Sequence, residues 1–227
     1  MKFLIIGGSK GIGKAIVEGL LQKDHEVIVA SRNNDEISHL PVEHISLDIL
    51  KDVSELNDLT ELNGLVYCPG SINLKPFNRL TIEDFSSDFD LNVIGAVKCI
   101  QTCLPALKKG EGSVVLFSTV AVHQGMAFHA SVAASKGAIE GLTRSLASEL
   151  APNIRVNAIA PSLTDTPLAK VLISNDKRRE ASENKHPLKR IGKAEDIASM
   201  AVHLLSETGS WITGQVIGID GGMSRLK

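Results

Sequence analysis

A glycine-rich run near the amino terminus has the residue types needed to bind the diphosphate of a nucleotide. It directly follows a short apolar stretch, opens a helical pattern, and consists of Gly7, Gly8, Ser9, Lys10, Gly11, Ile12 and Gly13. Gly7 allows a tight turn, Gly11 lets the backbone approach a phosphate, and Gly13 lets the helix pack against the strand. The free N–H groups of the helix start attract anions. The run therefore predicts dinucleotide binding, and a plain glycine-rich turn is the alternative.

The end of the second apolar run indicates which dinucleotide is bound. An acidic residue there would accept both ribose hydroxyls of NAD and would repel a 2′-phosphate. The chain instead reads Ala30-Ser31-Arg32, with no carboxylate. Arg32 and Lys10 are both cations within reach of a dianionic phosphate, and arginine offers it a planar fork. We expect NADP(H) to be preferred over NAD(H), and two ordinary surface cations are the alternative interpretation.

The elements that must position these groups alternate along the whole chain. Short apolar runs typical of buried strands lie at 3–6, 27–30, 65–68, 114–117, 156–159 and 216–219, with a weaker one at 43–47. Helical patterns lie near 11–23, 52–61, 81–108, 131–150 and 194–206. This alternation predicts an α/β, Rossmann-type, doubly wound parallel sheet with helices on both faces. No linker or repeat divides it, so a single domain over 1–227 is expected.

One polar stretch interrupts the alternation between Ser174 and Lys189. A solvated helix face followed by a turn at Pro187 is one interpretation of such a charge run. A mobile lid over a pocket is the other.

Composition argues against several classes of function. The net charge of −2 over 227 residues provides no field for nucleic acid. No stretch approaches the roughly 20 apolar residues that span a bilayer, so no membrane partner is expected. Three cysteines, an odd number, suit a reducing compartment, and we expect a cytoplasmic protein. The seven histidines show no paired metal-ligand spacing, so no metal is expected.

Several further motifs, in order along the chain, resemble the short-chain dehydrogenase/reductase family. They are the glycine run in its GxxxGxG form, Leu47-Asp48-Ile49, the glycine of Cys68-Pro69-Gly70, Asp90-Leu91-Asn92-Val93-Ile94-Gly95, Ala160-Pro161-Ser162-Leu163-Thr164 and Ile219-Asp220-Gly221-Gly222. The resemblance implies that Asp48 and Ile49 contact adenine, that Gly70, Pro161 and Thr164 line the cofactor site, and that Asn92 is catalytic. It also implies a homodimer or homotetramer through the helices near 81–108 and 131–150.

This chain differs from the family in the catalytic motif. The family expects Tyr-x-x-x-Lys, whereas residues 132–136 read Val-Ala-Ala-Ser-Lys. Lys136 is kept and is expected to hold the nicotinamide ribose, but Val132 stands in place of the phenol. The family's serine falls on Thr119, thirteen residues earlier, with Ser118 adjacent. Tyr67 cannot restore the phenol, because it is the only tyrosine and belongs to another strand.

The missing phenol removes the usual proton donor for a carbonyl reduction. General acid catalysis contributes roughly 10²–10⁴-fold, or about 3–5 kcal/mol of barrier. Candidate substitutes are His129, His123, a hydroxyl of Thr119 or Ser118, and Lys136 acting through a water held by Asn92. Ser131 is discounted because it points off the helix face that Val132 and Lys136 share.

Two functions remain open at this point. One is an NADP(H)-dependent oxidoreductase acting on a small carbonyl, imine or alkene with a non-standard proton donor. The other is a catalytically silent NADP(H)-binding sensor or partner subunit. Lys136 and Asn92 are compatible with both.

Overall fold

The computed structural model describes residues 1–226, and its centre is a sheet of seven parallel strands. The strand order is β3-β2-β1-β4-β5-β6-β9, with all six pairings parallel. The strands are Lys2–Ile6 (β1), Glu26–Ser31 (β2), Glu43–Ser46 (β3), Gly64–Tyr67 (β4), Ser113–Phe117 (β5), Arg155–Pro161 (β6) and Val216–Ile219 (β9). Each expected strand is present, the weak one at 43–47 included. The predicted doubly wound parallel sheet is confirmed.

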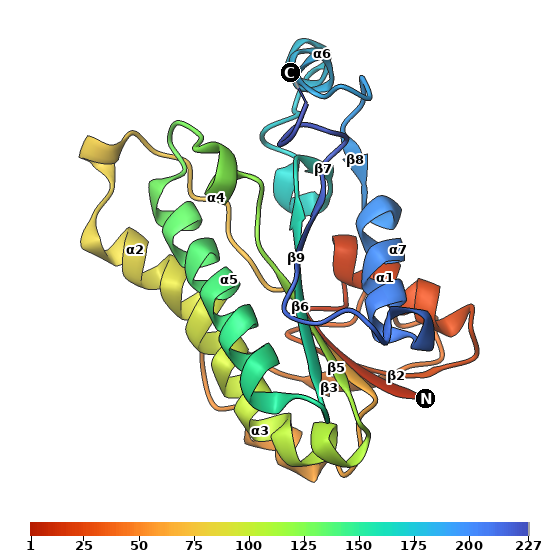
Figure 1. Ribbon diagram of the computed structural model, residues 1–227. Helices are drawn as coiled ribbons and strands as arrows, with labels where there is room; N and C mark the ends of the chain where they lie inside the picture. The colour runs from red at the N-terminus through yellow and green to blue at the C-terminus, as the bar shows by residue number, and fades with distance from the viewer. Residues whose placement is uncertain (227) are drawn as a thin grey trace.

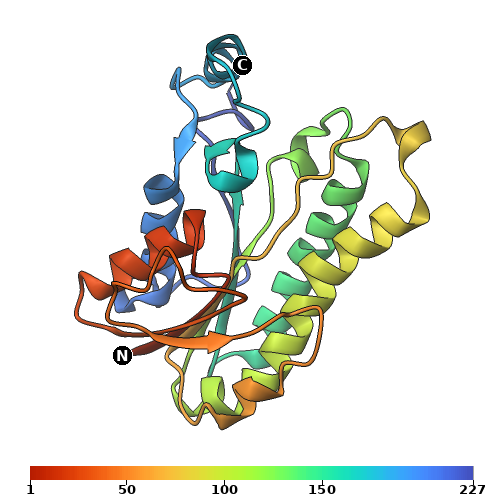
Figure 2. The same cartoon turned by 180° about the vertical axis from the view of Figure 1, so that it is seen from behind.

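Helices cover both faces of this sheet. They are Gly11–Leu21 (α1), Ile82–Phe89 (α2), Gly95–Lys109 (α3), Ala121–Gln124 (α4), Ala130–Leu150 (α5), Asp176–Lys185 (α6) and Ala194–Leu205 (α7). Figures 1 and 2 show α1 and α7 on one side of the sheet and α2, α3 and α5 on the other. None of the helices within residues 1–226 has the length and apolar character needed to cross a membrane.

Strand β1 shows why the strands lack polar residues. Leu4 and Ile6 point into the core beneath α3 and α5, whereas Phe3 and Ile5 point into the core beneath α1 and α7. All four are at most 1% exposed. A strand buried on both faces stabilises the fold only if successive side chains are apolar, which is the pattern seen in the sequence.

The prediction of a helix at 52–61 is wrong. Residues Ser54–Asp58 form a single 3₁₀ turn instead. The Asp52 carboxylate accepts a hydrogen bond from the N–H of Val53 at 2.8 Å, and the Ser54 hydroxyl also bonds to this carboxylate. Such local side-chain bonds compete with helical ones and leave only a short turn.

The helix expected at 81–108 is interrupted. Thr81 and Asp84 form a capping box that starts α2, and a π-helical turn at Asp90–Ile94 separates α2 from α3. π-Turns often accompany functional positions because they redirect side chains from the regular helical face. This one contains Asn92.

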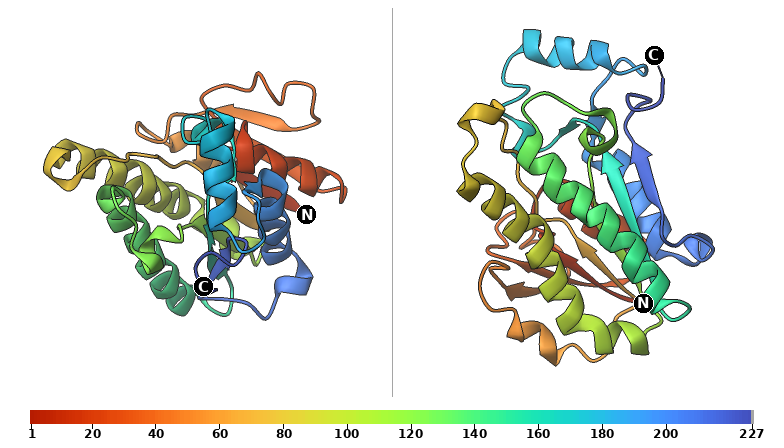
Figure 3. Two further views of the ribbon diagram at one scale, coloured as in Figure 1. Left: turned by 90° about the horizontal axis from the view of Figure 1, so that it is seen from above. Right: turned by 60° about the vertical axis from the view of Figure 1, so that its left-hand side comes forward.

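Strand order reverses between β1 and β4, and ligands of open α/β sheets bind at the carboxyl ends of strands at such a point. At this end, a small pairing of β7 (Thr164–Asp165) with β8 (Gly192–Lys193) supports α6. Figure 3 shows α6 above the body of the molecule, with the C-terminal segment beside it. The predicted polar stretch is thus a solvent-facing helix, since α6 has no buried residue.

Candidate active site

A cavity of about 650 Å³ lies at the carboxyl ends of the strands, over the reversal between β1 and β4. Of the residues assigned to the nucleotide from sequence, it is lined by Gly7, Lys10, Gly11, Ile12, Gly13, Gly70, Lys136, Pro161 and Thr164. Of those assigned to catalysis, it is lined by Lys136, Ser118, Thr119 and His129. The structure therefore brings both predicted groups to one cavity.

The glycine turn has the geometry of an anion site. Gly7 has a φ of +73°, which L side chains rarely adopt, and its N–H donates to the carbonyl of Ala30 at 2.8 Å. A Cβ on Gly13 would collide with the carbonyl oxygen of Gly7. Helix α1 begins at Gly11, and no side chain caps its first N–H groups. These groups point to the cavity with their hydrogen-bonding capacity unused, as a diphosphate requires.

Other predicted nucleotide contacts lie outside this lining. Ser9 and Ser31 are buried, the latter bonded to the carbonyl of Asn33, and Arg32 is exposed at the end of β2. Asp48 caps the N–H of Leu50 at 3.2 Å, and the side chain of Ile49 packs into the core. Their roles toward adenine and the 2′-phosphate stay predictions.

Lys10 has a neighbour that the sequence analysis missed. Its ammonium lies 3.5 Å from the carboxylate of Glu36, and both side chains are about half exposed. Glu36 follows β2 in the loop that carries Arg32. Any phosphate bound by Lys10 must share this cation with a carboxylate.

Lys136 is buried in α5 and faces the cavity with its ammonium. It is 8% exposed, and desolvation lowers the pKa of its ammonium to about 8, against an opposing influence of Cys68 and Asp88. Removing an ammonium from water disfavours its charged form, and a nearby polar or anionic ligand would restore it.

The side-chain oxygen of Asn92 has no hydrogen-bond partner among the described residues and lies near the Lys136 ammonium. Its Nδ2 donates to the carbonyl of Asp88 at 2.8 Å and to the hydroxyls of Ser71 and Ser135 at 3.1 and 3.2 Å. Its Oδ1 is buried without a partner within residues 1–226. Both this oxygen and the Lys136 ammonium lie within 3.6 Å of the position that a Cβ would take on Gly70. Asn92 and Lys136 therefore face one small polar space, which suits a bridging water or hydroxyl.

The side chains around Val132 differ in what they can donate. Val132 itself lines the cavity and carries no exchangeable proton. The Ser118 hydroxyl is engaged, because it donates to the buried carboxylate of Glu140 at 2.7 Å. Thr119 Oγ1 accepts from the N–H of Ala121 at 3.3 Å, which leaves its own proton for a ligand. Tyr67 is buried in the core and donates to the carbonyl of Leu91 at 2.6 Å, so it cannot serve the site.

The two histidines considered from sequence have different places. His129 lines the cavity, with Nδ1 2.7 Å from the carbonyl of Ala127. His123 is not part of that lining, and its Nε2 lies 3.1 Å from the carboxylate of Glu140. A role for His123 as a proton donor stays a prediction, and its ring is paired with a buried acid on α5.

The three cysteines have free thiols. Cys99 and Cys103 are buried in the core, and desolvation raises the pKa of each thiol to about 12. Cys68 lines the cavity, and burial likewise raises the pKa of its thiol to about 12 although the Lys136 ammonium opposes this.

The pairing of Ser162 with His186 was not predicted from the sequence. Both line the cavity, and Ser162 Oγ lies 2.7 Å from His186 Nε2. The only available signal was that Ser162 belongs to the Ala160-Pro161-Ser162-Leu163-Thr164 motif of the family resemblance. A contact between residues 24 positions apart has no signature in a single sequence.

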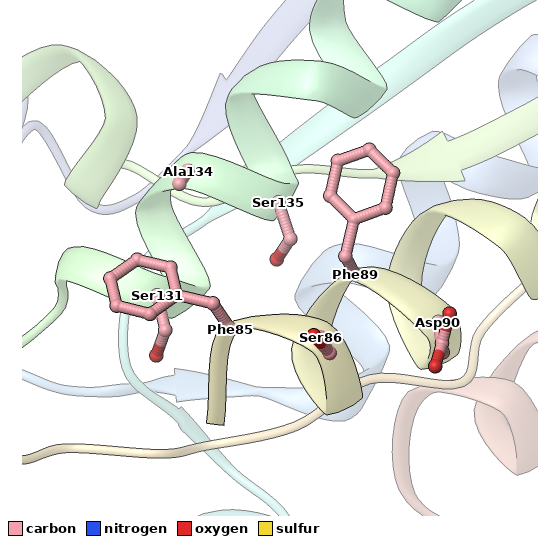
Figure 4. Close-up of a pocket in the computed structure, with 7 residues that line it drawn as sticks. All are labelled: Phe85, Ser86, Phe89, Asp90, Ser131, Ala134 and Ser135. Carbon is pink, nitrogen blue, oxygen red and sulfur yellow. The ribbon is translucent and has the colours of Figure 1, made fainter. Parts of the chain in front are cut away.

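A second cavity of about 310 Å³ lies between α2 and α5. Figure 4 shows Phe85 and Phe89 of the α2 side facing Ser131, Ala134 and Ser135 of α5. Ser131 thus opens to a different side of α5 from Val132 and Lys136, as predicted.

The chemistry of the large cavity fits a nicotinamide dinucleotide. The glycine turn offers N–H groups to a diphosphate, and Lys136 and Asn92 offer a cation and a carbonyl oxygen to a ribose or its neighbours. When bound, such a cofactor supplies hydride chemistry.

Comparisons with known proteins decide the family. Residues 7–224 match the family model described as enoyl-(acyl carrier protein) reductase. A tropinone reductase homolog of Arabidopsis thaliana is 35% identical, over 99% of this chain and 90% of that protein. The chain belongs to the short-chain dehydrogenase/reductase family. Its members are NAD(P)-dependent oxidoreductases, and the relatives include the 3-oxoacyl-[acyl-carrier-protein] reductase FabG of Thermotoga maritima, 33% identical over 97% of this chain and 96% of that one.

Solved short-chain dehydrogenase/reductase structures agree with this assignment. The ligand-free aldohexose dehydrogenase of Thermoplasma acidophilum has a TM-score of 0.92 and 27% identity, covering 100% of this chain and 94% of that one. ElxO with NADP bound has a TM-score of 0.88 and 27% identity, covering 98% of each chain.

Proposed function

We propose that this chain is an NADP(H)-dependent oxidoreductase that reduces a small organic carbonyl, imine or alkene with a non-standard proton donor. One observation supports this most directly: the uncapped start of α1 and the buried Lys136 ammonium open on a single cavity. A nucleotide held by the first is delivered to the second. The NADP bound to ElxO supports the choice of cofactor.

The preference for the phosphorylated cofactor rests on the loop after β2. Arg32 is an exposed cation at the strand end, and Lys10 is near the same loop through its contact with Glu36. A 2′-phosphate carries two negative charges and favours a site with two cations.

The substrate end of the cavity is mostly apolar. Its side chains are Ile72, Leu74, Val120, Met126, Val132, Leu163, Leu168 and Leu172. The Thr119 hydroxyl keeps its proton for a substrate oxygen, and the Ser162 hydroxyl lines the same cavity. An alkene or activated imine would depend less on that proton than a ketone does.

A catalytically silent NADP(H) sensor or partner subunit is the second candidate. Val132 favours it, because the side chain beside Lys136 cannot exchange a proton. In that case Lys136 and Asn92 serve only to bind the nucleotide.

Titration calorimetry with NADPH and NADH, followed by turnover assays, separates the two. The probes are tropinone, a 3-oxoacyl thioester and an enoyl thioester, chosen from the names of the relatives and the family model. NADPH should bind tighter than NADH, and wild type should reduce at least one probe. If wild type is inactive and Val132→Tyr gains carbonyl reduction, the silent function is correct. If neither nucleotide binds, both candidates fail.

A further inference from the structure

We propose that the Ser162 hydroxyl, backed by the His186 imidazole, donates the proton that the missing phenol would otherwise supply. This inference rests on the proposed oxidoreductase function. Ser162 is a catalytic residue in this proposal, and His186 is a positioning residue that acts through it.

The ring of His186 is held in one orientation. It is 2% exposed, directly after α6. Its Nδ1 lies 2.8 Å from the carbonyl oxygen of Ser182, which can only accept, so Nδ1 carries a proton. The other nitrogen, Nε2, lies 2.7 Å from Ser162 Oγ. A hydroxyl, an imidazole and a third group that orients the imidazole are the parts of an activated hydroxyl.

The backbone of Ser162 is also held in place at the strand end. Its own carbonyl accepts from Thr164 Oγ1 at 2.9 Å, and the preceding carbonyl, of Pro161, accepts from the N–H of Val120 at 3.2 Å. The second contact ties the ends of β5 and β6 together. Ser162 and Thr119 therefore follow neighbouring strands into one cavity, which Val132 and Lys136 also line.

Met223 completes the arrangement. Its thioether sulfur lies 3.0 Å from Ser162 Oγ. When His186 is protonated, Nε2–H donates to Ser162 Oγ, and the hydroxyl proton can point only to another acceptor. A thioether is a weak acceptor, so the oxygen of a substrate displaces it readily.

A hydride transfer and a proton transfer together complete the reduction of the carbonyl. The carbonyl carbon receives hydride from the reduced nicotinamide dinucleotide, its π bond to oxygen breaks, and the cofactor is oxidised. The carbonyl oxygen takes the proton of the Ser162 hydroxyl. Ser162 Oγ recovers a proton from Nε2 of the His186 imidazolium, which becomes neutral, and water in the cavity that both residues line returns a proton to the pair through the Ser162 hydroxyl.

The same contacts would also serve merely to fasten α6 and the C-terminal segment over the sheet. The two roles differ in what they change. Loss of a fastening lowers the melting temperature and raises KM. Loss of a proton donor lowers kcat and leaves the melting temperature and KM nearly unchanged.

The test uses the full chain with NADPH and the most active probe among tropinone and the 3-oxoacyl thioester. Ser162→Ala should lower kcat by roughly 10²-fold, within the range for a general acid, while KM and the dissociation constant of NADPH change less than about threefold. Ser162→Thr, which keeps the hydroxyl, should recover most of kcat. The double variant Ser162→Ala/His186→Gln should be no slower than Ser162→Ala, because the two residues act as one unit.

Thr208→Ala is the matched control. The Thr208 hydroxyl lies 3.0 Å from Nδ1 of His203, but neither residue lines the cavity. This variant should keep wild-type kcat. Ser162→Gly is a second way to remove the hydroxyl should Ser162→Ala fold poorly.

A readout without turnover comes from the histidine side-chain ¹H–¹⁵N spectrum of the nucleotide-free protein. Ser162→Ala should move the Nε2 resonance of His186 and leave Nδ1, which faces Ser182, in place. An unmoved Nε2 resonance overturns the proposal. The proposal is also overturned if turnover survives both Ser162→Ala and His186→Gln, or if it is lost in His129→Gln instead. In either case the proposed oxidoreductase function stands. A wild type that binds NADPH but reduces no probe overturns both the Ser162 proposal and the proposed oxidoreductase function.

Discussion

The burial of the Lys136 ammonium makes this residue a source of instability in the nucleotide-free protein. Desolvation holds its pKa at about 8, below the ordinary 10.5. Between these values the unfolded chain binds more protons than the folded one, so stability rises with pH through this window. The folded protein is penalised most below pH 8, where the buried group is charged.

Lys136→Met should therefore stabilise the nucleotide-free protein at pH 7, by on the order of 3 kcal/mol. The gain over wild type should shrink as pH rises from 8 toward 10.5, because the wild-type lysine becomes neutral in both states. Urea unfolding at several pH values measures it, with the exposed Lys177→Met as the matched control. A gain that is constant with pH would contradict the burial argument.

Glu36 limits how strongly Lys10 can hold a 2′-phosphate. The two groups lie 3.5 Å apart at the surface, where an ion pair contributes about 0.2–1 kcal/mol. Glu36→Gln should therefore tighten NADPH binding by roughly two- to fivefold and change NADH binding less. Calorimetry with both cofactors measures this, and Glu43→Gln, in β3, is the control. Equal gains for both cofactors would place Lys10 away from the 2′-phosphate.

Among the elements, α6 depends on few contacts for its position over the cavity. It buries no residue, yet Ser182, Lys185 and His186 line the cavity. The Arg179 guanidinium bonds to the Asp165 carboxylate of β7 at 2.6 Å, and this partner raises the pKa of Arg179. One ion pair thus joins α6 to the small β7–β8 pairing.

Arg179→Gln should loosen α6 without unfolding the protein. We expect the substrate KM to rise several-fold, the NADPH affinity to hold, and the melting temperature to change little, because an exposed ion pair contributes little to global stability. Steady-state kinetics and thermal melts measure this, and Lys177→Gln on the same helix is the control. An unchanged KM would mean that other contacts hold α6, such as those of His186 and of Arg178 with the Val171 carbonyl.

The elements also show what a single sequence can predict. Buried strands such as β1 and β5 were evident, because a strand covered on both faces requires an unbroken apolar run. The glycine turn was evident because only glycine suits the φ of Gly7 and the close packing at Gly13. The π-turn at Asp90–Ile94 was not, because a single sequence gives no pattern for a local change of helical pitch.

In the candidate site, too, the sequence predicted local motifs but not tertiary contacts. Residues that belong to one local motif, such as Gly11 or Lys136, were identified and do line the cavity. Partners that tertiary contacts bring together were missed, since Glu36 beside Lys10 and His186 beside Ser162 share no motif. The contact of His123 with Glu140 was missed for the same reason, because the two residues lie on different elements.

At the scale of the whole molecule, the face formed by α2 and its neighbours exposes large apolar side chains. Ile82 is 76% exposed, Phe89 42%, Ile94 41%, and Phe77 and Phe128 are also exposed. The cavity between α2 and α5 opens here, with Phe85 and Phe89 at its edge. Apolar side chains gathered on one face typically mark an interface, and we propose that a second copy of this chain covers them.

A charge on this face should therefore separate the copies. Phe89→Glu should convert a dimer or tetramer into a monomer at micromolar concentration, because a carboxylate facing its own copy is buried unpaired. Light scattering after size exclusion measures the mass, and Leu188→Glu is the control, because Leu188 is also exposed (66%) but lies on the C-terminal side of α6. Since Asn92 and Ser135 lie directly behind this face and bond to each other at 3.2 Å, the monomer should also bind NADPH more weakly. A wild type that is already monomeric would leave the apolar face without a second copy and overturn the proposed assembly.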